Sequence, residues 1–142
     1  MDNTTQKLAD FCIQTNFEQI PTAVVERAKL LILDTVGIMI RARHDSESTP
    51  SMLAAVSKLG LDRGDCHVFG DKTTYSPSAA ALINASLAHS LDFDDTHAEA
   101  SIHASAPIVP AVIAAAEMVG ASGRDLITAC VVGYEVHVRL GS

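Results

Sequence analysis

The sequence predicts an all-α fold, with about six helices packed into a compact bundle. Three observations indicate this. Apolar residues recur at helical spacing, Ser, Pro and Gly stand where helices would begin and end, and no stretch sustains the alternation of a strand. The chain of 142 residues is long enough for one domain with one core. We therefore expect a single helical domain over residues 1–142.

Two helices are predicted before residue 41. Asn3 or Thr4 is placed to cap the first, whose apolar stripe consists of Leu8, Phe11, Cys12 and Thr15. Pro21 suits the first turn of the second helix, where its missing N–H costs nothing. This second helix has a broad apolar face, which indicates that it packs on others, and we expect it to end near Ile40.

The next third of the chain is more polar. Residues 41–49 are expected to be flexible. Thr49 followed by Pro50 then predicts a third helix by its cap and its proline at the first helical position, and this helix is expected to end at Gly60. Between that glycine and Thr74, residues 66–69 are predicted to form one short strand.

The last three helices are predicted from clear start signals. Ser76 and Pro77 begin a fourth helix that is apolar nearly all round, which is typical of a central, buried helix, and we expect it to reach Phe93. Ser105 is expected to cap a fifth helix that ends at Gly120. Residues 122–125 fit a capping box, with Asp in the Glu/Gln place, at the start of the last helix.

The charge pattern limits the partners. The net charge is −7, which argues against nucleic acid. No Lys or Arg occurs from Thr73 to Gly123, although five acidic residues lie in that span: Asp92, Asp94, Asp95, Glu99 and Glu117. A small anion bound there would find only histidines and helix N-termini in this chain.

The cysteines and the apolar runs of the sequence indicate the cellular compartment. Three widely spaced cysteines without a CxxC pair are typical of reduced packing residues. The first residues contain no basic and apolar regions of a signal peptide, and the longest apolar run, residues 106–116, is well short of the ~20 residues that span a bilayer. We expect a soluble, cytoplasmic protein that does not enter a membrane.

One polar segment, residues 89–107, stands between the fourth and fifth predicted helices. It contains His89, His97 and His103 together with Thr96 and four carboxylates, between long apolar stretches. Ionisable side chains are costly to bury without partners, so the segment is either a surface loop or a functional site. Asp94, Asp95 and Glu99 are expected to be solvated, as most carboxylates are.

Asp92 is the carboxylate that the pattern favours for function. If the fourth helix continues through Thr96, then Asp92, Thr96 and His89 share one face, and such a trio can orient a substrate or fix the tautomer of a histidine. Asn84 lies on the same face, eight residues earlier, and is a candidate for substrate binding. The alternative for Asn84 is a buried amide whose hydrogen bonds are satisfied in the core.

His103 is the predicted acid–base residue. It precedes a helix start, and the positive end of a helix favours the neutral, basic form of an imidazole. His97 is evenly balanced between a functional and a structural role, whereas His67, His89 and His137 are expected to be structural.

A metal site is the rival interpretation of the polar segment. Its candidate ligands would be His89, Asp92, Asp94, His97 and His103, but their spacing matches no common metal motif. Motifs for phosphate, dinucleotide or serine-hydrolase chemistry are not found either.

Several stretches resemble the MmgE/PrpD family, whose members include 2-methylcitrate dehydratase, cis-aconitate decarboxylase and iminodisuccinate epimerase. The similarity is carried by residues 84–96 with their Asp-Phe-Asp-Asp-Thr core, by residues 103–110 and by residues 120–126 and 132–135. The opening, with Leu8-Ala-Asp-Phe and Leu33-Asp-Thr-Val-Gly, is also similar. The resemblance covers essentially the whole chain.

The resemblance implies a helical domain with a smaller α/β lid, acting as a homodimer without metal or organic cofactor. The implied chemistry is proton movement beside the carboxylates of a small polycarboxylate, by dehydration, decarboxylation or epimerisation. Residue by residue, the family's active-site Asp, Thr and His fall on Asp92, Thr96 and His103. The loop between Thr96 and His103 is about one residue longer than in the decarboxylase, which bears on the choice of substrate.

Family members are about three times longer, so the resemblance covers only their N-terminal part. The family's active-site lysine and further histidines would lie beyond it. We therefore expect an incomplete domain that is at most weakly active alone, acting with a missing C-terminal portion or as a homodimer. The alternatives are a non-catalytic helical module that dimerises or docks through an apolar face and, less favoured, a metal-dependent hydrolase.

Overall fold

The fold is built around α4 (Pro77–His89), which packs against α5 (Ser105–Val119) on one side and α2 (Thr22–Asp45) on another. The structure is a computed structural model that describes residues 3–142. Six of the thirteen residues of α4 are buried: Ala79, Ala80, Ile83, Asn84, Leu87 and Ala88. This confirms the central, buried helix that its apolar sequence predicted.

The described residues contain six α-helices, which confirms the predicted all-α fold. Beyond the three named above they are α1 (Thr4–Gln14), α3 (Thr49–Lys58) and α6 (Gly123–Gly141). A 3-10 helix, η1 (Phe17–Gln19), joins α1 to α2, and two strands of two residues, β1 (Cys66–His67) and β2 (Thr74–Tyr75), lie between α3 and α4.

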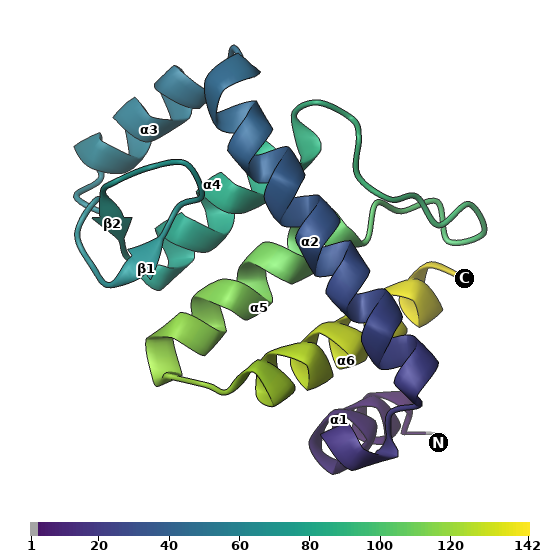
Figure 1. Cartoon of the computed structure of the whole chain (residues 1–142). Helices are drawn as coiled ribbons and strands as arrows, with labels where there is room; N and C mark the ends of the chain where they lie inside the picture. The colour runs from purple at the N-terminus through teal and green to yellow at the C-terminus, as the bar shows by residue number, and fades with distance from the viewer. Residues whose placement is uncertain (1–2) are drawn as a thin grey trace.

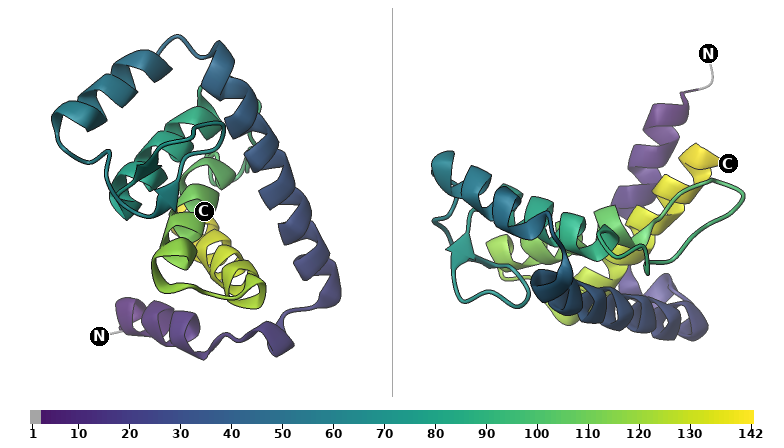
Figure 2. Two further views of the ribbon diagram at one scale, coloured as in Figure 1. Left: turned by 60° about the vertical axis from the view of Figure 1, so that its left-hand side comes forward. Right: turned by 90° about the horizontal axis from the view of Figure 1, so that it is seen from above.

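The other helices are arranged around α4 and α5 in a compact bundle, as predicted (Figures 1 and 2). The long α2 runs across one side of the bundle and contacts α4, α5 and α6. α6 lies beside α5, α3 packs on α4, and α1 lies at the edge near α6 with none of its residues buried. No helix within residues 3–142 combines the length and the apolar character that crossing a membrane requires.

The predicted starts of α1, α4 and α6 are confirmed, whereas Thr49 and Ser105 are the first residues of α3 and α5 and not their caps. The Asn3 side chain accepts a hydrogen bond from the backbone N–H of Gln6 at 3.2 Å, and Ser76 caps α4. Ser122 and Asp125 form the predicted capping box at the start of α6. Gly120 ends α5 in the left-handed conformation, with φ of 65°, which glycine adopts without steric cost.

α2 is longer than predicted. It continues into the segment that was expected to be flexible, residues 41–49, and ends at Asp45 instead of near Ile40. An ion pair one turn apart, Arg41 to Asp45 at 2.6 Å, supports the extension, and Ala42 is fully buried. Arg43 also reaches Asp71, 28 residues further along the chain, at 3.0 Å. Tertiary packing therefore holds a polar turn in helical form.

α4 is shorter than predicted and ends at His89, not at Phe93. The hydroxyl of Ser90 donates to the backbone carbonyl of Ser86 at 2.7 Å, and Asp92 adopts a positive φ of 56°. A non-glycine residue in that left-handed region cannot continue a helix. Asp92 and Thr96 are therefore not on one helical face with His89, contrary to the condition that the sequence argument set.

The strand predicted at residues 66–69 is limited to the two residues of β1, which pairs antiparallel with β2, a strand that the sequence did not predict. The buried amide of Asn84 joins this hairpin to α4. Its side-chain oxygen accepts from the N–H of Phe69 at 3.0 Å, and its nitrogen donates to the carbonyl of His67 at 2.9 Å. Both ends of the amide are thus used by backbone, as a satisfied core amide requires.

Candidate active site

Two histidines and one buried aspartate meet where α4 ends and α5 begins. His89 is the last residue of α4, and His103 stands two residues before Ser105, where α5 begins. Asp94 comes from the loop between them, which extends from the body of the molecule in Figure 1. We call these three residues the His–Asp cluster. Its members are positioned by two helices that pack closely on each other.

The distances define the cluster. Nδ1 of His89 lies 3.1 Å and 3.2 Å from the two carboxylate oxygens of Asp94. Nδ1 of His103 lies 3.4 Å from Oδ2 of the same carboxylate, within ion-pair range but without hydrogen-bond geometry. The two rings stand edge to face, with centroids 4.8 Å apart. The Asp94 side chain is fully buried, whereas those of His89 and His103 are 55% and 34% exposed.

The prediction that Asp94 and Asp95 are solvated is wrong. Asp95 turns inward as well: its Oδ1 accepts from the backbone N–H of Ser105 at 2.9 Å, and its Oδ2 accepts from the hydroxyl of Tyr134 at 3.3 Å. Asp95 therefore performs the capping that was predicted for Ser105, whose own hydroxyl pairs with the hydroxyl of Tyr134. A carboxylate at a helix N-terminus is stabilised by the unpaired N–H groups there. Glu99, by contrast, is exposed as expected.

The residues predicted as catalytic are partly brought together. Asp92 is exposed, but a carboxylate oxygen of it lies within 4.8 Å of the ligand atoms of the His–Asp cluster, including His103. Thr96 is exposed, and no hydrogen bond links it to Asp92 or His103 among the described residues. His97 begins a tight hairpin: its backbone bridges to Ile102, and its Nδ1 accepts from the N–H of Ala100 at 3.1 Å.

This hairpin, residues 97–102, is fixed to the end of α6. A Cβ atom at Gly141 would lie 2.9 Å from the carbonyl oxygen of Ala100 and 2.8 Å from its Cβ. Only glycine allows so close an approach. The loop that carries His103 is therefore held at one side by α5 and at the other by α6.

Four side chains in this region could hold a metal ion. His89, Asp92, Asp94 and His103 each present one ligand atom, and all four atoms lie within 4.8 Å of one another. Imidazole nitrogens and carboxylate oxygens are ligands that zinc and manganese accept. His97, the fifth ligand considered from sequence, is not in this group.

Two groups near Asp95, the buried Cys130 thiol and the Tyr134 hydroxyl, have raised pKa values. Burial and the nearby Asp95 raise the pKa of the Cys130 thiol to about 11. Burial, again with a contribution from Asp95, raises the pKa of the Tyr134 hydroxyl well above its ordinary value, although its hydrogen bond with Ser105 acts in the opposite direction. Both groups are therefore neutral at physiological pH, and the imidazoles are the groups suited to exchange protons.

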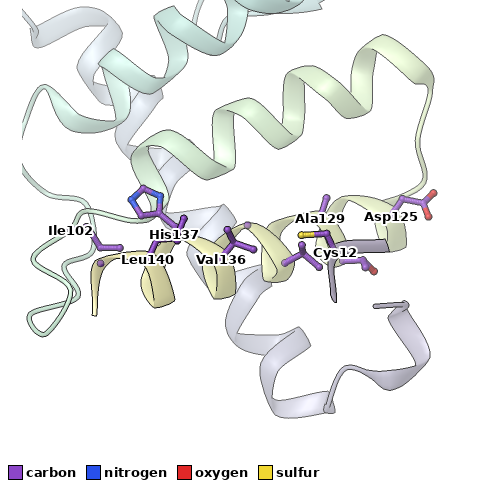
Figure 3. Close-up of a pocket in the computed structure, with 11 residues that line it drawn as sticks. Cys12, Ile102, Asp125, Ala129, Val136, His137 and Leu140 are labelled. Carbon is purple, nitrogen blue, oxygen red and sulfur yellow. The ribbon is translucent and has the colours of Figure 1, made fainter. Parts of the chain in front are cut away.

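A large hollow of the described structure lies elsewhere. It runs along α6, has a volume of about 890 Å³ and is lined by Cys12, Ile102, Ala129, Val132, Val136 and Leu140, among others. Figure 3 shows this α6 groove, with Cys12 of α1 beside Ala129 and with Val136, His137 and Leu140 further along the helix. Its lining is mostly apolar and includes no member of the His–Asp cluster. An apolar groove without converging polar groups is a poor site for a charged substrate.

The fold and the site together define a class: a helical domain that holds two imidazoles against one buried carboxylate beside a helix N-terminus. Comparison with known proteins identifies the family within that class. The chain belongs to the MmgE/PrpD family, since the model of the MmgE/PrpD N-terminal domain matches residues 6–142.

Named relatives agree with this assignment. The chain is 33% identical to the cis-aconitate decarboxylase-like protein oryM of Aspergillus oryzae, over 99% of this chain and 30% of that protein. It is 32% identical to a cis-aconitate decarboxylase of Aspergillus terreus, over 96% of this chain and 29% of the relative. The human cis-aconitate decarboxylase is 34% identical over 82% of this chain and 25% of its own length. The chain thus spans about 30% of these relatives, at their N-terminal part.

Proposed function

We propose that this chain supplies the histidine-bearing part of an MmgE/PrpD-type lyase that acts on a small polycarboxylate by acid–base catalysis in the cytoplasm. The observation that carries the proposal is the contact of His103 with buried Asp94 in a chain whose relatives are named cis-aconitate decarboxylases. Cis-aconitate is therefore the first substrate to test, followed by 2-methylcitrate and citrate.

In this proposal His103 exchanges the proton. When a carboxylate leaves as CO₂, the electron pair of the broken C–C bond stays on the substrate carbon, and an imidazolium at His103 supplies the proton that forms the new C–H bond. In a dehydration the neutral ring instead takes the proton from one carbon, the electron pair of that C–H bond forms the C=C bond, and the C–O bond of the neighbouring carbon breaks so that the hydroxyl, with a proton returned to it, leaves as water. Asp92 and Thr96, which are exposed, are free to orient the substrate, with His97 as a further contact. No metal or organic cofactor is required for these steps.

Asn84 is a weaker candidate for substrate binding. Its amide is buried, and both its oxygen and its nitrogen are occupied by the β1 segment. The residue is only 1% exposed, so a substrate could reach the remaining lone pair or N–H only if the packing around Asn84 opened. The structure favours the alternative of a core amide.

The charges near the cluster indicate what this chain lacks. Asp92, Asp94 and Asp95 lie together, and no Lys or Arg occurs between Thr73 and Gly123. A substrate with three carboxylates needs cationic partners in a water-poor site. We expect these partners on polypeptide equivalent to the rest of the longer relatives, so that the 142-residue chain alone is at most weakly active.

The test is a turnover assay on cis-aconitate, 2-methylcitrate and citrate. The chain is assayed alone and together with the C-terminal part of the Aspergillus terreus decarboxylase that it does not span. Turnover in the complemented form that falls about 10²-fold or more in His103→Gln supports the proposal. The matched control is His67→Gln, because His67 pairs with Glu117 on the surface, outside the site. Absence of turnover on all three substrates would overturn it.

A second candidate, an interaction module, is favoured by the α6 groove. α6 has 19 residues but only Cys130 is buried, and Leu140 is 69% exposed in the groove. We propose that this face is covered by polypeptide equivalent to the part of the relatives that this chain does not span. In the alternative outcome a second copy of this chain covers it, as the homodimer that the family resemblance implies. Light scattering after size exclusion separates them. Val136→Asp should weaken association about tenfold or more, and Leu59→Asp, exposed on another helix end, is the control.

The metal-dependent hydrolase is favoured only by the convergence of His89, Asp92, Asp94 and His103 within 4.8 Å. Elemental analysis of the purified chain tests it. A stoichiometric bound transition metal would support this candidate, and protein without metal that retains its fold would count against it.

A further inference from the structure

Asp94 has an unusual set of partners. Its side chain is fully buried, yet among the described residues no backbone N–H, Lys or Arg donates to it, and its contacts are the two histidines. A buried carboxylate without donors is strongly disfavoured. The donor that the distances give to Asp94 is the imidazole of His89, and the ring of His103 lies next to the same carboxylate at 3.4 Å.

The chemistry of the two groups then fixes where the hydrogens are. An ionised carboxylate has only acceptor atoms, and a neutral imidazole has one N–H and one bare nitrogen. A bare Nδ1 facing Asp94 would place a lone pair against a negative oxygen, which is repulsive. Nδ1 of His89, at 3.1 Å and 3.2 Å from the two oxygens, must therefore carry its hydrogen.

The same reasoning applies to His103. Its Nδ1 is buried from solvent and has no hydrogen-bond partner, and a charged oxygen nearby is Oδ2 of Asp94 at 3.4 Å. Oδ2 also lies 3.2 Å from Nδ1 of His89, so the two rings compete for the same acceptor oxygen. A small approach of the His103 ring would turn this ion-pair contact into a hydrogen bond and satisfy the buried atom.

We propose that Asp94 is the positioning residue of the site, holding His103 and His89 as Nδ1–H tautomers so that Nε2 is the basic atom of each ring. The inference rests on the proposed function for its catalytic meaning, since it names the atom of His103 that exchanges the proton. It also gives His89 a role as the second imidazole that contacts the same carboxylate, whereas the sequence predicted only a structural role for this residue.

The tautomers can be read from the ¹⁵N shifts of the histidine rings in the 142-residue chain. The spectra are recorded at rising pH until the ring shifts stop changing, so that they report the neutral imidazoles. His89 and His103 should show a protonated Nδ1 and a bare Nε2, whereas neutral imidazole in water favours the opposite tautomer. A bare Nδ1 on His103 would overturn the proposal.

Asp94→Asn provides the second measurement. An amide has both a donor and an acceptor, so His103 should lose its single tautomer and show averaged shifts. The matched control is Glu117→Gln, which should change His67 and leave His89 and His103 unchanged. If Asp94→Asn does not fold, His89→Ala, at a half-exposed ring, replaces it: with its competitor gone, the Nδ1 proton of His103 should move downfield. An unchanged His103 in either variant contradicts the proposal.

The activity assay separates this inference from the proposed function. In the complemented enzyme, Asp94→Asn should lower kcat about 10²-fold with little change in KM, because the base is misdirected while substrate contacts remain. Correct tautomers without any turnover would overturn the proposed function alone. Turnover with a bare Nδ1 on His103 would overturn this inference alone.

Discussion

Asp71 and Asp94 are both largely buried carboxylates, and their partners differ in kind. Asp71 accepts from Nη2 of Arg43 at 3.0 Å, from the backbone N–H groups of Lys72 and Thr73, and from the hydroxyl of Tyr75. Asp94 is more deeply buried but meets only His89 and His103. One carboxylate is compensated by a permanent cation and backbone, the other by groups that gain and lose protons near neutral pH.

The difference separates a carboxylate that stabilises the fold, Asp71, from the one that we propose positions the two histidines, Asp94. The Asp71 network closes the β1–β2 hairpin and holds the end of α2, so its partners should not change charge. The Asp94 network lies beside the exposed carboxylate of Asp92, where a substrate can reach it. A buried charge supported only by imidazoles is stable enough to fold and still able to take part in proton transfer.

The largest expected loss of stability is at Asp71. Asp71→Ala removes four hydrogen bonds and leaves Arg43 without its carboxylate, so we expect a loss of about 2–3 kcal/mol in the free energy of unfolding. Asp94→Asn should cost about 1 kcal/mol or less, because the amide has the same shape, keeps an acceptor oxygen for the His89 ring and removes a buried charge. Urea denaturation of the two variants measures both. Equal losses would contradict the distinction.

The next effect concerns the loop that carries His103. Gly141→Ala forces a Cβ against Ala100, and overpacking of this kind costs about 1–3 kcal/mol. The matched control is Gly37→Ala in α2, where a Cβ would meet nothing within 4 Å and alanine should stabilise the helix by about 0.5–1 kcal/mol. Thermal unfolding followed by circular dichroism would show opposite signs for the two variants. The same sign would mean that Gly141 and Ala100 do not constrain each other.

A substitution at Asp95 tests the start of α5 and leaves the three residues of the His–Asp cluster unchanged. Asp95→Ala removes the acceptor at the start of α5, and the loss of a helix cap costs about 0.5–2 kcal/mol. Asn3→Ala removes a cap from α1, which has no buried residue, so the global stability should hardly change. Urea midpoints compare the two caps, and an equal effect would show that α1 contributes to the core after all.

The smallest effect is the pH dependence that Asp71 contributes. Burial acts to raise the pKa of Asp71, but hydrogen bonds from the Thr73 N–H and the Arg43 guanidinium outweigh it, so the pKa lies below its ordinary value of 3.8. A carboxylate with a depressed pKa stabilises the fold above its unfolded value, and this contribution disappears as the pH falls below about 3.8 through the folded value. Unfolding at stepped acidic pH should show a weaker slope in Asp71→Asn; an identical slope would contradict it.

Local sequence signals predicted most of the fold, because helix caps and helix-ending glycines act within one turn of the chain. Asn3, Ser76, Gly120 and the 122–125 capping box are all in their predicted roles. The errors depend on contacts between distant residues. Arg43 extends α2 by reaching Asp71, and neither residue signals the other in the sequence.

The candidate site was predicted less well for the same reason. Residues 89–107 were identified correctly as the polar segment, but which carboxylate faces inward depends on where α4 stops. Ending the helix at His89 turns Asp94 inward and leaves Asp92 exposed, the reverse of the expected pattern. The signal that could have indicated the stop is Ser90, whose hydroxyl can bond back to the preceding turn.

The isolation of α1 has a consequence for how the molecule opens. Helices shorter than about 12–15 residues are marginal in water without packing partners, and α1 has 11 residues, none of them buried. Its amide hydrogens should therefore exchange with deuterium far sooner than those of α4, and proteases should cut there first. We therefore expect α1 to unfold locally while the rest of the molecule stays folded. The amide hydrogens of α4 and α5, which flank the histidines, should remain protected from exchange.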